Sequence, residues 1–413
     1  MKKLKVLWFA VTPSLYSTGQ RSHNGGGWIA SLEKIVREES SIELGVAFEH
    51  PDKIFRVQQD GVTYYPINRE FSKFEKLKNK IVYTPEETWV IPQCLKIIED
   101  FKPDVIHVFG SEWCFGLLVN FTKIPVVIHM QGSLPAYYNA YYPPGYSRLD
   151  VIKYVGLNLK RQIQENLKIK TFISKSKREE KILKSCNYFM GRTEWDHAVT
   201  RVYSPQSKYY YCAEALRESF FNIHESWKPN NHTCCIISST LSHPTYKGFD
   251  LILKTALILK NHLSVSFEWQ VFGVNEVDFH EWKTGIKSSE VNVRLMGVVS
   301  AEKLKNHLLD SDVYVHPSYI ENSPNSICEA QLIGVPVICT NVGGVSSLVQ
   351  HSFSGFLVPA NDPYQLSYSI KKITNDKLLA SRVSENARKV AIERNNVKLI
   401  LSELINIYKS IIS

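Results

Sequence analysis

The chain has 413 residues, of which 44% are hydrophobic and 22% are charged, and its formal net charge is +9. This length exceeds what one ordinary hydrophobic core supports, so we expect two domains, and the composition excludes disordered and collagen-like chains. No apolar stretch approaches the ~18 residues that a membrane-spanning helix needs.

Short apolar runs alternate with longer amphipathic segments in the first half, as in β–α–β units. The first apolar run follows Lys5 and is too short for a secretory signal, so it predicts a buried strand. Residues 135–146 contain five tyrosines and three prolines, which predicts a surface loop. The predicted strands of this half are residues 5–11, 42–48, 62–66, 105–108, 126–129 and 188–193, and residues 28–39 are a predicted helix.

The pattern restarts after residue 226. Strands are predicted at residues 234–239, 267–272, 291–295, 313–316 and 336–340, and helices at 250–263, 301–309, 325–333 and 396–411. We therefore expect an α/β chain with a Rossmann-like N-terminal domain over residues 1–215 and a Rossmann-like C-terminal domain over residues 225–395. A last helix within residues 396–413 is expected to pack back on the first domain.

The cysteine pattern indicates the redox compartment. None of the eight cysteines lies in a CxxC pair, so a disulfide framework is not expected and a reducing cytoplasm fits best.

Residues 151–185 contain ten Lys or Arg against three Asp or Glu. Two interpretations stay open: solvated amphipathic helices, or a basic face for peripheral contact with anionic lipid at the inner face of a membrane. We find no zinc-site or RNA-binding motif, so nucleic acid is not an expected partner.

The most informative segment is ENSPNSICE, from Glu321 to Glu329. Its pattern predicts a loop followed by a short helix, which Asn325 or Ser326 would cap and Gly334 would end. The helix N-terminus would present free N–H groups and the positive end of its dipole, which suits a phosphate. Ionised carboxylates only accept hydrogen bonds, so the two glutamates suit the hydroxyl groups of a sugar or a ribose.

This segment resembles the E-x7-E motif of retaining glycosyltransferase family 4, whose members have the GT-B fold. Other segments resemble the same family in the same order: the glycine loop 25–27, His129, GRTEWD at 191–196, YKGFD at 246–250, GVVS at 297–300, GVPVI at 334–338, Gly343-Gly344 and GFLV at 355–358. The resemblance implies two Rossmann-like domains that face each other across a deep cleft, with the active site in that cleft.

The resemblance also implies a site for a nucleoside-diphosphate sugar. Lys247 would bind the diphosphate, Glu329 the ribose hydroxyls and Glu321 the hydroxyls of the transferred sugar. His129 would lie near the reacting sugar, and a histidine held by local packing at a strand end is the alternative. The remaining implied contacts are the backbones of Gly26 and Gly27 near the diphosphate or the acceptor, Val298 in the turn that borders the base, and the N–H groups of Asn325, Ser326 and Ile327 in the sugar and phosphate cradle.

The sequence departs from the family before Lys247, where the resemblance implies a second phosphate-binding arginine. Residues 238–243 contain no Lys or Arg. The hydroxyl groups of Ser239 or Thr240 could donate hydrogen bonds to phosphate instead. We expect the lost cation to weaken the site by about 1.5–3 kcal/mol, the scale of one charged hydrogen bond.

The expected activity is therefore transfer of a hexose-type sugar, with retention, from a nucleoside-diphosphate sugar to a glycan or lipid-linked acceptor in cell-surface polysaccharide synthesis. No cofactor and no metal ion are expected. A nicotinamide-dependent dehydrogenase is disfavoured because GxGxxG does not follow the first strand. A sugar-nucleotide epimerase or hydrolase of the same fold, and a catalytically silent nucleotide- or glycan-binding module, stay open as alternatives.

Overall fold

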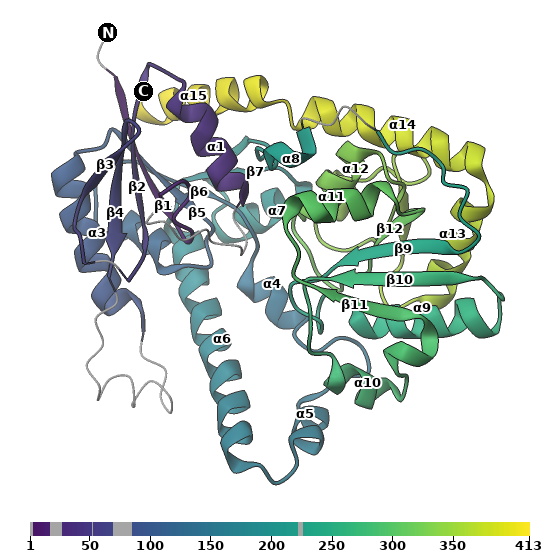
Figure 1. Ribbon diagram of the computed structural model, residues 1–413. Coiled ribbons are helices and arrows are strands. Elements are labelled where there is room, and N and C mark those ends of the chain that lie inside the picture. The colour runs from purple at the N-terminus through teal and green to yellow at the C-terminus, as the bar shows by residue number, and fades with distance from the viewer. Residues whose placement is uncertain (1–2, 17–26, 52, 69–84, 222–225) are drawn as a thin grey trace. The chain divides into compact units, whose positions relative to one another are not determined.

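The computed structural model describes residues 3–16, 27–51, 53–68, 85–221 and 226–413. The chain forms two compact units. Unit 1 comprises Met1–Tyr138, Asn158–Ala215 and Asn395–Ser413, and unit 2 comprises Asn139–Leu157 and Leu216–Arg394. Each unit contains its own sheet covered by helices, as expected of α/β domains (Figure 1).

Unit 1 is built on an eight-stranded sheet with the order β3-β4-β2-β1-β5-β6-β7-β8. Only β3 pairs antiparallel, with β4, among the strands of this sheet in the described ranges. The strands are β1 Leu4–Ala10, β2 Ile42–Glu49, β3 Val57–Gln59, β4 Val62–Ile67, β5 Val105–Phe109, β6 Val126–His129, β7 Tyr188–Gly191 and β8 Lys208–Tyr211.

The central strand β1 is buried on both faces, which explains its continuous apolar sequence. Val6, Trp8 and Ala10 pack in one core with helices α1 and α15, whereas Leu7 and Phe9 pack in a second core with α3, α6 and the 3-10 helix η1. These elements are α1 Gly27–Arg37, α3 Glu87–Phe101, η1 Cys114–Asn120, α6 Leu159–Ser185 and α15 Val397–Ile412. Unit 1 is completed by α4 Leu134–Asn139, which ends one residue beyond it, and by α7 Glu194–Tyr203.

The C-terminal helix α15 is anchored in unit 1 by a buried polar contact. The Tyr408 hydroxyl accepts a hydrogen bond from the Trp8 indole at 3.0 Å and lies 2.7 Å from Nδ1 of His107. Because all three side chains are fully buried, these bonds satisfy groups that would be costly to leave unpaired. The last helix therefore belongs to the same compact unit as the first strand, although about 400 residues separate Trp8 from Tyr408.

Unit 2 is built on a parallel six-stranded sheet with the order β11-β10-β9-β12-β13-β14. Helices α9 and α13 pack together on one face, and α11 and α12 pack together on the other (Figure 1). The strands are β9 Cys235–Thr240, β10 Phe267–Phe272, β11 Val293–Gly297, β12 Val313–His316, β13 Val337–Thr340 and β14 Phe356–Val358. The helices are α8 Glu218–Phe221, α9 Phe249–Asn261, α10 Asp278–Thr284, η2 Ser288–Val291, α11 Ala301–Leu309, α12 Asn325–Ile333, η3 Val345–Ser347, α13 Pro363–Asn375 and α14 Lys377–Arg394.

Residues 139–157 belong to unit 2, which corrects the assignment of all of residues 1–215 to one N-terminal domain. The buried Tyr146 lies with its hydroxyl 3.2 Å from Nδ1 of His280 in α10. Asp150 in α5 (Arg148–Val155) pairs with Lys283 at 2.7 Å. The prediction of a loop over residues 135–146 was wrong at its start, because α4 places Pro135 in its first turn, where no backbone N–H is required.

Candidate active site

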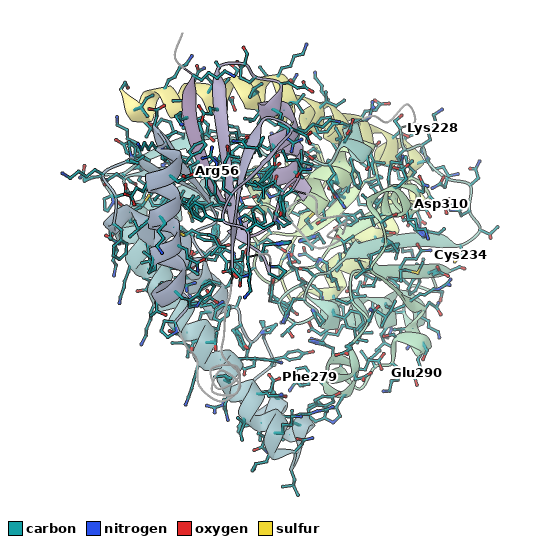
Figure 2. All side chains as sticks on the ribbon, turned by 60° about the vertical axis from the view of Figure 1, so that its left-hand side comes forward. Arg56, Lys228, Cys234, Phe279, Glu290 and Asp310 are labelled. Carbon is teal, nitrogen blue, oxygen red and sulfur yellow. The ribbon has the colours of Figure 1, made fainter. Side chains whose placement is uncertain are left out.

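The candidate site lies at the carboxyl ends of β9, β12 and β13 in unit 2, the edge where open parallel sheets bind ligands. In Figure 2 the labelled residues Cys234, Glu290 and Asp310 mark the other edge, since they precede β9, β11 and β12. Loops 241–248 and 317–324 carry Lys247 and Glu321, respectively.

Gly248 allows loops 241–248 and 317–324 to pack closely against each other. Gly248 has φ +79°, and a Cβ atom on it would lie 2.0 Å from the carbonyl oxygen of Pro317. The N–H of Tyr319 also donates to the carbonyl of Tyr246 at 2.8 Å. Only glycine fits this left-handed, closely packed position, so the KG sequence fixes where the Lys247 side chain starts.

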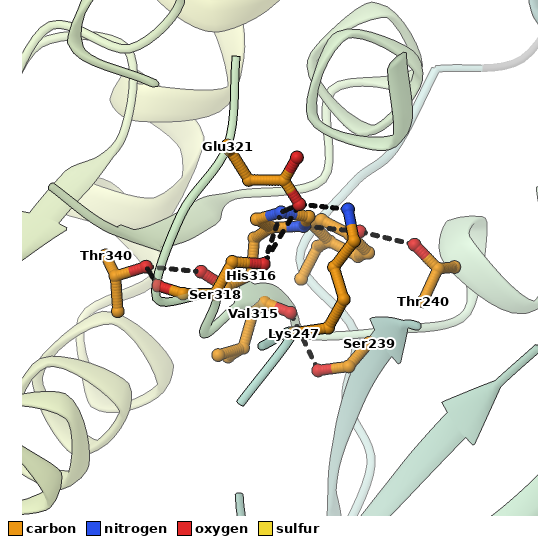
Figure 3. A network of polar contacts seen from close by, with 9 residues as sticks. Ser239, Thr240, Lys247, Val315, His316, Ser318, Glu321 and Thr340 are labelled. Atoms are coloured by element: carbon orange, nitrogen blue, oxygen red, sulfur yellow. Dashed lines mark hydrogen bonds and ion pairs between the residues drawn. The ribbon is translucent and has the colours of Figure 1, made fainter. Parts of the chain in front are cut away.

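Lys247 and Glu321 form an ion pair inside a polar network (Figure 3). The same Glu321 oxygen lies 3.1 Å from Nε2 of His316 and accepts a 3.1 Å hydrogen bond from the Ser318 hydroxyl. Burial opposes charge on both members of the pair, but their mutual attraction outweighs it. The pKa of Glu321 falls to about 2, helped by His316, and the pKa of Lys247 is raised. Both groups are therefore charged at neutral pH.

The Gly343-Gly344 turn holds the backbone of Glu321. The N–H of Gly344 donates to the Glu321 carbonyl at 3.0 Å. Gly343 has φ +51°, and a Cβ atom on it would lie only 1.8 Å from that same carbonyl oxygen. This turn follows β13, so the glycine pair that the sequence marked as a family feature positions the carboxylate from the neighbouring strand.

Helix α12 begins beside this network. Pro324 is its N-cap and makes no side-chain cap hydrogen bond, so the prediction that Asn325 or Ser326 caps the helix was wrong. Proline loses nothing there, because its missing N–H would have no helical partner. Asn325, Ser326 and Ile327 form the first turn, and Gly334 ends the helix with φ +97°, as predicted.

Glu329, about one turn into α12, is held by a residue that the sequence did not reveal. Nε and Nη2 of Arg217 each donate to a different carboxylate oxygen of Glu329 at 2.7 Å. The Glu329 side chain is 5% exposed and that of Arg217 is 34% exposed. Arg217 lies 112 positions from Glu329, in the stretch predicted to join the domains, and no local pattern signals such a contact.

Ser239 and Thr240, the two predicted hydroxyl donors to phosphate, are the last residues of strand β9. The Ser239 hydroxyl is fully buried, donates to the Val315 carbonyl at 2.7 Å and accepts from the Trp269 indole at 3.0 Å. A serine hydroxyl has one proton, so Ser239 has none to offer a phosphate in this arrangement. Thr240 lies half-buried at the strand end, with its hydroxyl 2.6 Å from that of Tyr314.

The other predicted residues lie elsewhere in the two units. Val298 follows β11 in unit 2 and is 61% exposed. His129 ends β6 of unit 1, stacked near His107 at 5.5 Å, and burial followed by the nearby Arg192 lowers its pKa to about 3, so it is neutral. Gly27 begins α1 in unit 1, and Gly26 lies outside the described residues.

The described residues contain neither a group of side chains that could hold a metal ion nor a helix that could span a membrane. In the described part of the chain no three His, Cys, Asp or Glu side chains are grouped so as to hold a metal ion. Asp310 and Asp312 form an Asp-x-Asp pattern at the amino end of β12, where Asp312 accepts a 2.8 Å hydrogen bond from the Ile236 N–H. None of the helices in the described ranges is both long and apolar enough to cross a bilayer.

Comparison with known proteins identifies the part of the chain that carries this site. Residues 223–390 match the model of the family described as glycosyl transferases group 1. These residues are therefore similar to a group 1 glycosyl transferase domain. The matched residues include Lys247, Glu321, Glu329 and the Gly343-Gly344 turn, and the predicted resemblance to a glycosyltransferase family is confirmed.

Two relatives of the chain are named as sugar transferases. The chain is 24% identical over 188 residues to an amylovoran biosynthesis glycosyltransferase of Erwinia amylovora. This match covers 44% of this chain and 45% of that protein. It is 34% identical over 105 residues to an Escherichia coli UDP-Gal:alpha-D-GlcNAc-diphosphoundecaprenol alpha-1,3-galactosyltransferase. This match covers 25% of this chain and 27% of that protein. The chain thus matches less than half the length of either relative.

The fold of the whole chain is similar to that of solved transferases. A sucrose-phosphate synthase from Thermosynechococcus elongatus superimposes with a TM-score of 0.68 and 16% identity, over 99% of each chain. At this identity the likeness shows the fold alone. It confirms the predicted α/β fold of the GT-B type, with two Rossmann-like units.

Proposed function

We propose that the protein is a retaining glycosyltransferase that moves a hexose-type sugar from a nucleoside-diphosphate sugar to a glycan or lipid-linked acceptor. The observation that carries this proposal is the arrangement at the carboxyl edge of the unit 2 sheet. There the Lys247 ammonium and the N-terminus of α12 can receive a diphosphate, and two buried, paired carboxylates, Glu321 and Glu329, can receive hydroxyl groups.

The proposed reaction uses the charges of this site. The bond between the sugar C1 and the phosphate oxygen breaks as positive charge develops on the sugar ring. Lys247 and the N–H groups at the start of α12 stabilise the negative charge that develops on the leaving diphosphate. The acceptor hydroxyl forms its bond to C1 on the face that the phosphate leaves and passes its proton to a phosphate oxygen. The products are the lengthened acceptor, with unchanged anomeric configuration, and the nucleoside diphosphate.

The names of the relatives support the substrate class. One relative is named for a UDP-galactose donor and a diphosphoundecaprenol-linked acceptor, and another is named for amylovoran biosynthesis. We therefore propose UDP as the first nucleotide to test and a lipid-linked glycan as the first acceptor. All eight cysteines are free thiols, which supports a reducing compartment such as the cytoplasm.

The test is to incubate the protein with UDP-hexoses, with and without a diphospholipid-linked glycan, and to follow UDP release and the product by NMR. We expect UDP release that depends on the acceptor and an α-linked product from an α-linked donor. UDP release without acceptor would favour a hydrolase, and an altered sugar still attached to UDP would favour an epimerase. A β-linked product would contradict retention.

A separate proposal concerns membrane contact through α6. No residue of this helix before Ser176 is buried, and Leu159 and Ile163 are 70% and 46% exposed. Its exposed cations are Lys160, Arg161, Lys168, Lys170, Lys177, Lys181 and Lys184. We propose that this helix attracts the protein to an anionic membrane surface, where the lipid-linked acceptor would lie.

Reversing two of these charges tests the membrane proposal. Lys168→Glu/Lys170→Glu is expected to weaken binding to phosphatidylglycerol-containing vesicles by at least about 2 kcal/mol, from roughly 1 kcal/mol for each basic residue near the surface. Lys389→Glu/Lys398→Glu makes the same change in net charge at exposed positions of α14 and α15 and is the control. Equal binding of both double variants in a sedimentation assay would show that α6 is not the contact.

A further inference from the structure

Three side chains share one oxygen of the Glu321 carboxylate. Lys247 pairs with Oε1, and this atom also lies 3.1 Å from Nε2 of His316 and 3.1 Å from the Ser318 hydroxyl oxygen (Figure 3). The Glu321 side chain is 6% exposed and His316 is 1% exposed, so water reaches this cluster poorly. The charges of the cluster therefore have to be balanced by its own members.

Binding of a nucleoside-diphosphate sugar would change this balance, and this step rests on the proposed function. In the free protein the charges of Lys247 and Glu321 cancel. The doubly negative diphosphate of the donor would attract the Lys247 ammonium, so that Glu321 loses part of its cation. No Lys or Arg occupies residues 238–243, so the neighbouring strand end supplies no second cation.

His316 can supply the missing positive charge without losing a hydrogen bond. Its Nε2–H can donate to Glu321 whether the ring is neutral or protonated. Nδ1 lies 3.4 Å from the Tyr314 hydroxyl, whose oxygen lies 2.6 Å from that of Thr240. A hydroxyl both donates and accepts, so Tyr314 can donate to a neutral ring. By donating to Thr240 instead, Tyr314 can accept from a protonated ring, and neither ring nitrogen is then left unpaired.

The surroundings of His316 make its proton depend on Lys247. Burial lowers the pKa of His316, the hydrogen bond and charge of Glu321 raise it, and the charge of Lys247 lowers it. The ring is therefore neutral while the ammonium lies on Glu321. Moving the ammonium toward a diphosphate removes one cause of the low pKa and leaves the cause that raises it. Burial raises the pKa of the other titratable groups beside the ring, which keeps them neutral: Tyr314, and Cys339 opposite His316 in β13.

We propose that His316 is a positioning residue that takes up a proton from solvent when the nucleotide sugar binds. The imidazolium then holds the Glu321 carboxylate as the Lys247 ammonium turns to the diphosphate. It also adds the positive charge that residues 238–243 lack. His316 acts through Glu321 and does not touch the reacting atoms. Because a proton accompanies the donor, donor affinity should fall as pH rises.

The first experiment measures this proton by calorimetry, as UDP-glucose binds in buffers that differ in ionisation enthalpy. UDP-glucose is the probe because its diphosphate has no group that titrates near neutral pH. Between pH 7 and 8 the wild type should take up roughly half to one proton per bound UDP-glucose, and its affinity should fall by up to about tenfold per pH unit. His316→Gln keeps a donor to Glu321 but cannot titrate, so the uptake and the pH dependence should both vanish.

His243→Gln is the matched control for His316→Gln. His243 is exposed on the loop that carries Lys247, and this variant should take up the proton as the wild type does. Uptake that persists in His316→Gln would overturn the proposal, because Glu321 or another group would then bind the proton. Uptake that is lost only in His243→Gln would also overturn it and assign the proton to the exposed loop.

The second experiment needs no ligand and follows the His316 imidazole by nitrogen-15 NMR, assigned with His316→Gln. At pH 7 the ring should be neutral in the wild type and charged in Lys247→Met, because that variant leaves Glu321 as its charged neighbour. Lys254→Met, which removes the lysine paired with Asp250, should leave the ring neutral. A neutral ring in Lys247→Met would show that its proton does not depend on Lys247 and would contradict the proposal.

Failure of the proposed function is distinguishable from failure of this inference. If the wild type binds neither UDP-glucose, GDP-mannose nor ADP-glucose, the proposed function fails, and donor-linked proton uptake fails with it. If the wild type binds one of them without proton uptake, the proposed function stands and the role of His316 is overturned. Thermal unfolding of each variant, measured beside the titrations, separates loss of fold from loss of proton uptake.

Discussion

Replacing Lys247 by alanine should reduce the rate of sugar transfer by about 10²–10³-fold, the usual loss when one donor to a developing negative charge is removed. The effect is expected to be large because no Lys or Arg occupies residues 238–243, where a second cation would stand. Phosphate stabilisation then depends on Lys247 and on the N-terminus of α12. The measurement is kcat and KM for the UDP-sugar, with the loss expected mainly in kcat.

Loss of Lys247 also leaves the carboxylate of Glu321 buried without its cation, which should destabilise the fold by about 3–5 kcal/mol. The double variant Lys247→Met/Glu321→Gln removes both charges and should recover most of that stability but no activity. Lys254→Ala, which removes the partner of Asp250 one to two turns along α9, is the control for loss of a paired lysine. Activity in the double variant within tenfold of the wild type would contradict the role of this pair in catalysis.

Gly343→Ala should both destabilise the protein and inactivate it. The new Cβ atom would lie 1.8 Å from the Glu321 carbonyl oxygen, where the backbone has to move, and φ is +51° at this position. Overpacking and a left-handed conformation together should cost about 2–4 kcal/mol. The shift would carry Glu321 away from Lys247, so transfer should fall as well. Urea unfolding and the transfer assay measure the two effects.

Gly61→Ala is the matched control for this substitution. Gly61 has φ +80°, but a Cβ atom on it would have nothing within 4 Å. It should therefore show only the conformational cost, about 1–2 kcal/mol, with full activity. If Gly343→Ala behaved like Gly61→Ala, the close contact with Glu321 would not be what requires glycine.

The fold of unit 2 follows closely from the sequence, because its elements have regular patterns. The predicted helices at 301–309 and 325–333 and the strand at 313–316 have the observed bounds. Helix α3 was missed because Pro92 is its sixth residue, where a proline removes the backbone hydrogen bond to the carbonyl of Thr88 and so speaks against a helix. Strand β8 was missed because its residues, KYYY, are partly exposed at a sheet edge.

The candidate site was predicted where residues lie close along the chain or match a motif. Lys247, Glu321 and the glycine turns are of this kind, and the structure brings them together. Arg217 and His316 were missed because their importance comes from a tertiary contact that no spacing encodes. Likewise, the role of Ser239 in the sheet depends on Val315 and Trp269, which only the folded chain places beside it.

The most direct test of the central claim is a thermal-unfolding titration of the wild type and of Glu329→Ala with UDP, GDP and ADP. A nucleoside diphosphate at a hundred times its dissociation constant should stabilise the wild type by about 2.7 kcal/mol. We predict this stabilisation with one of the three nucleotides, UDP first, and its loss in Glu329→Ala. No stabilisation of the wild type by any of them, or equal stabilisation of the variant, would contradict a nucleotide-sugar site at the carboxyl edge of the unit 2 sheet.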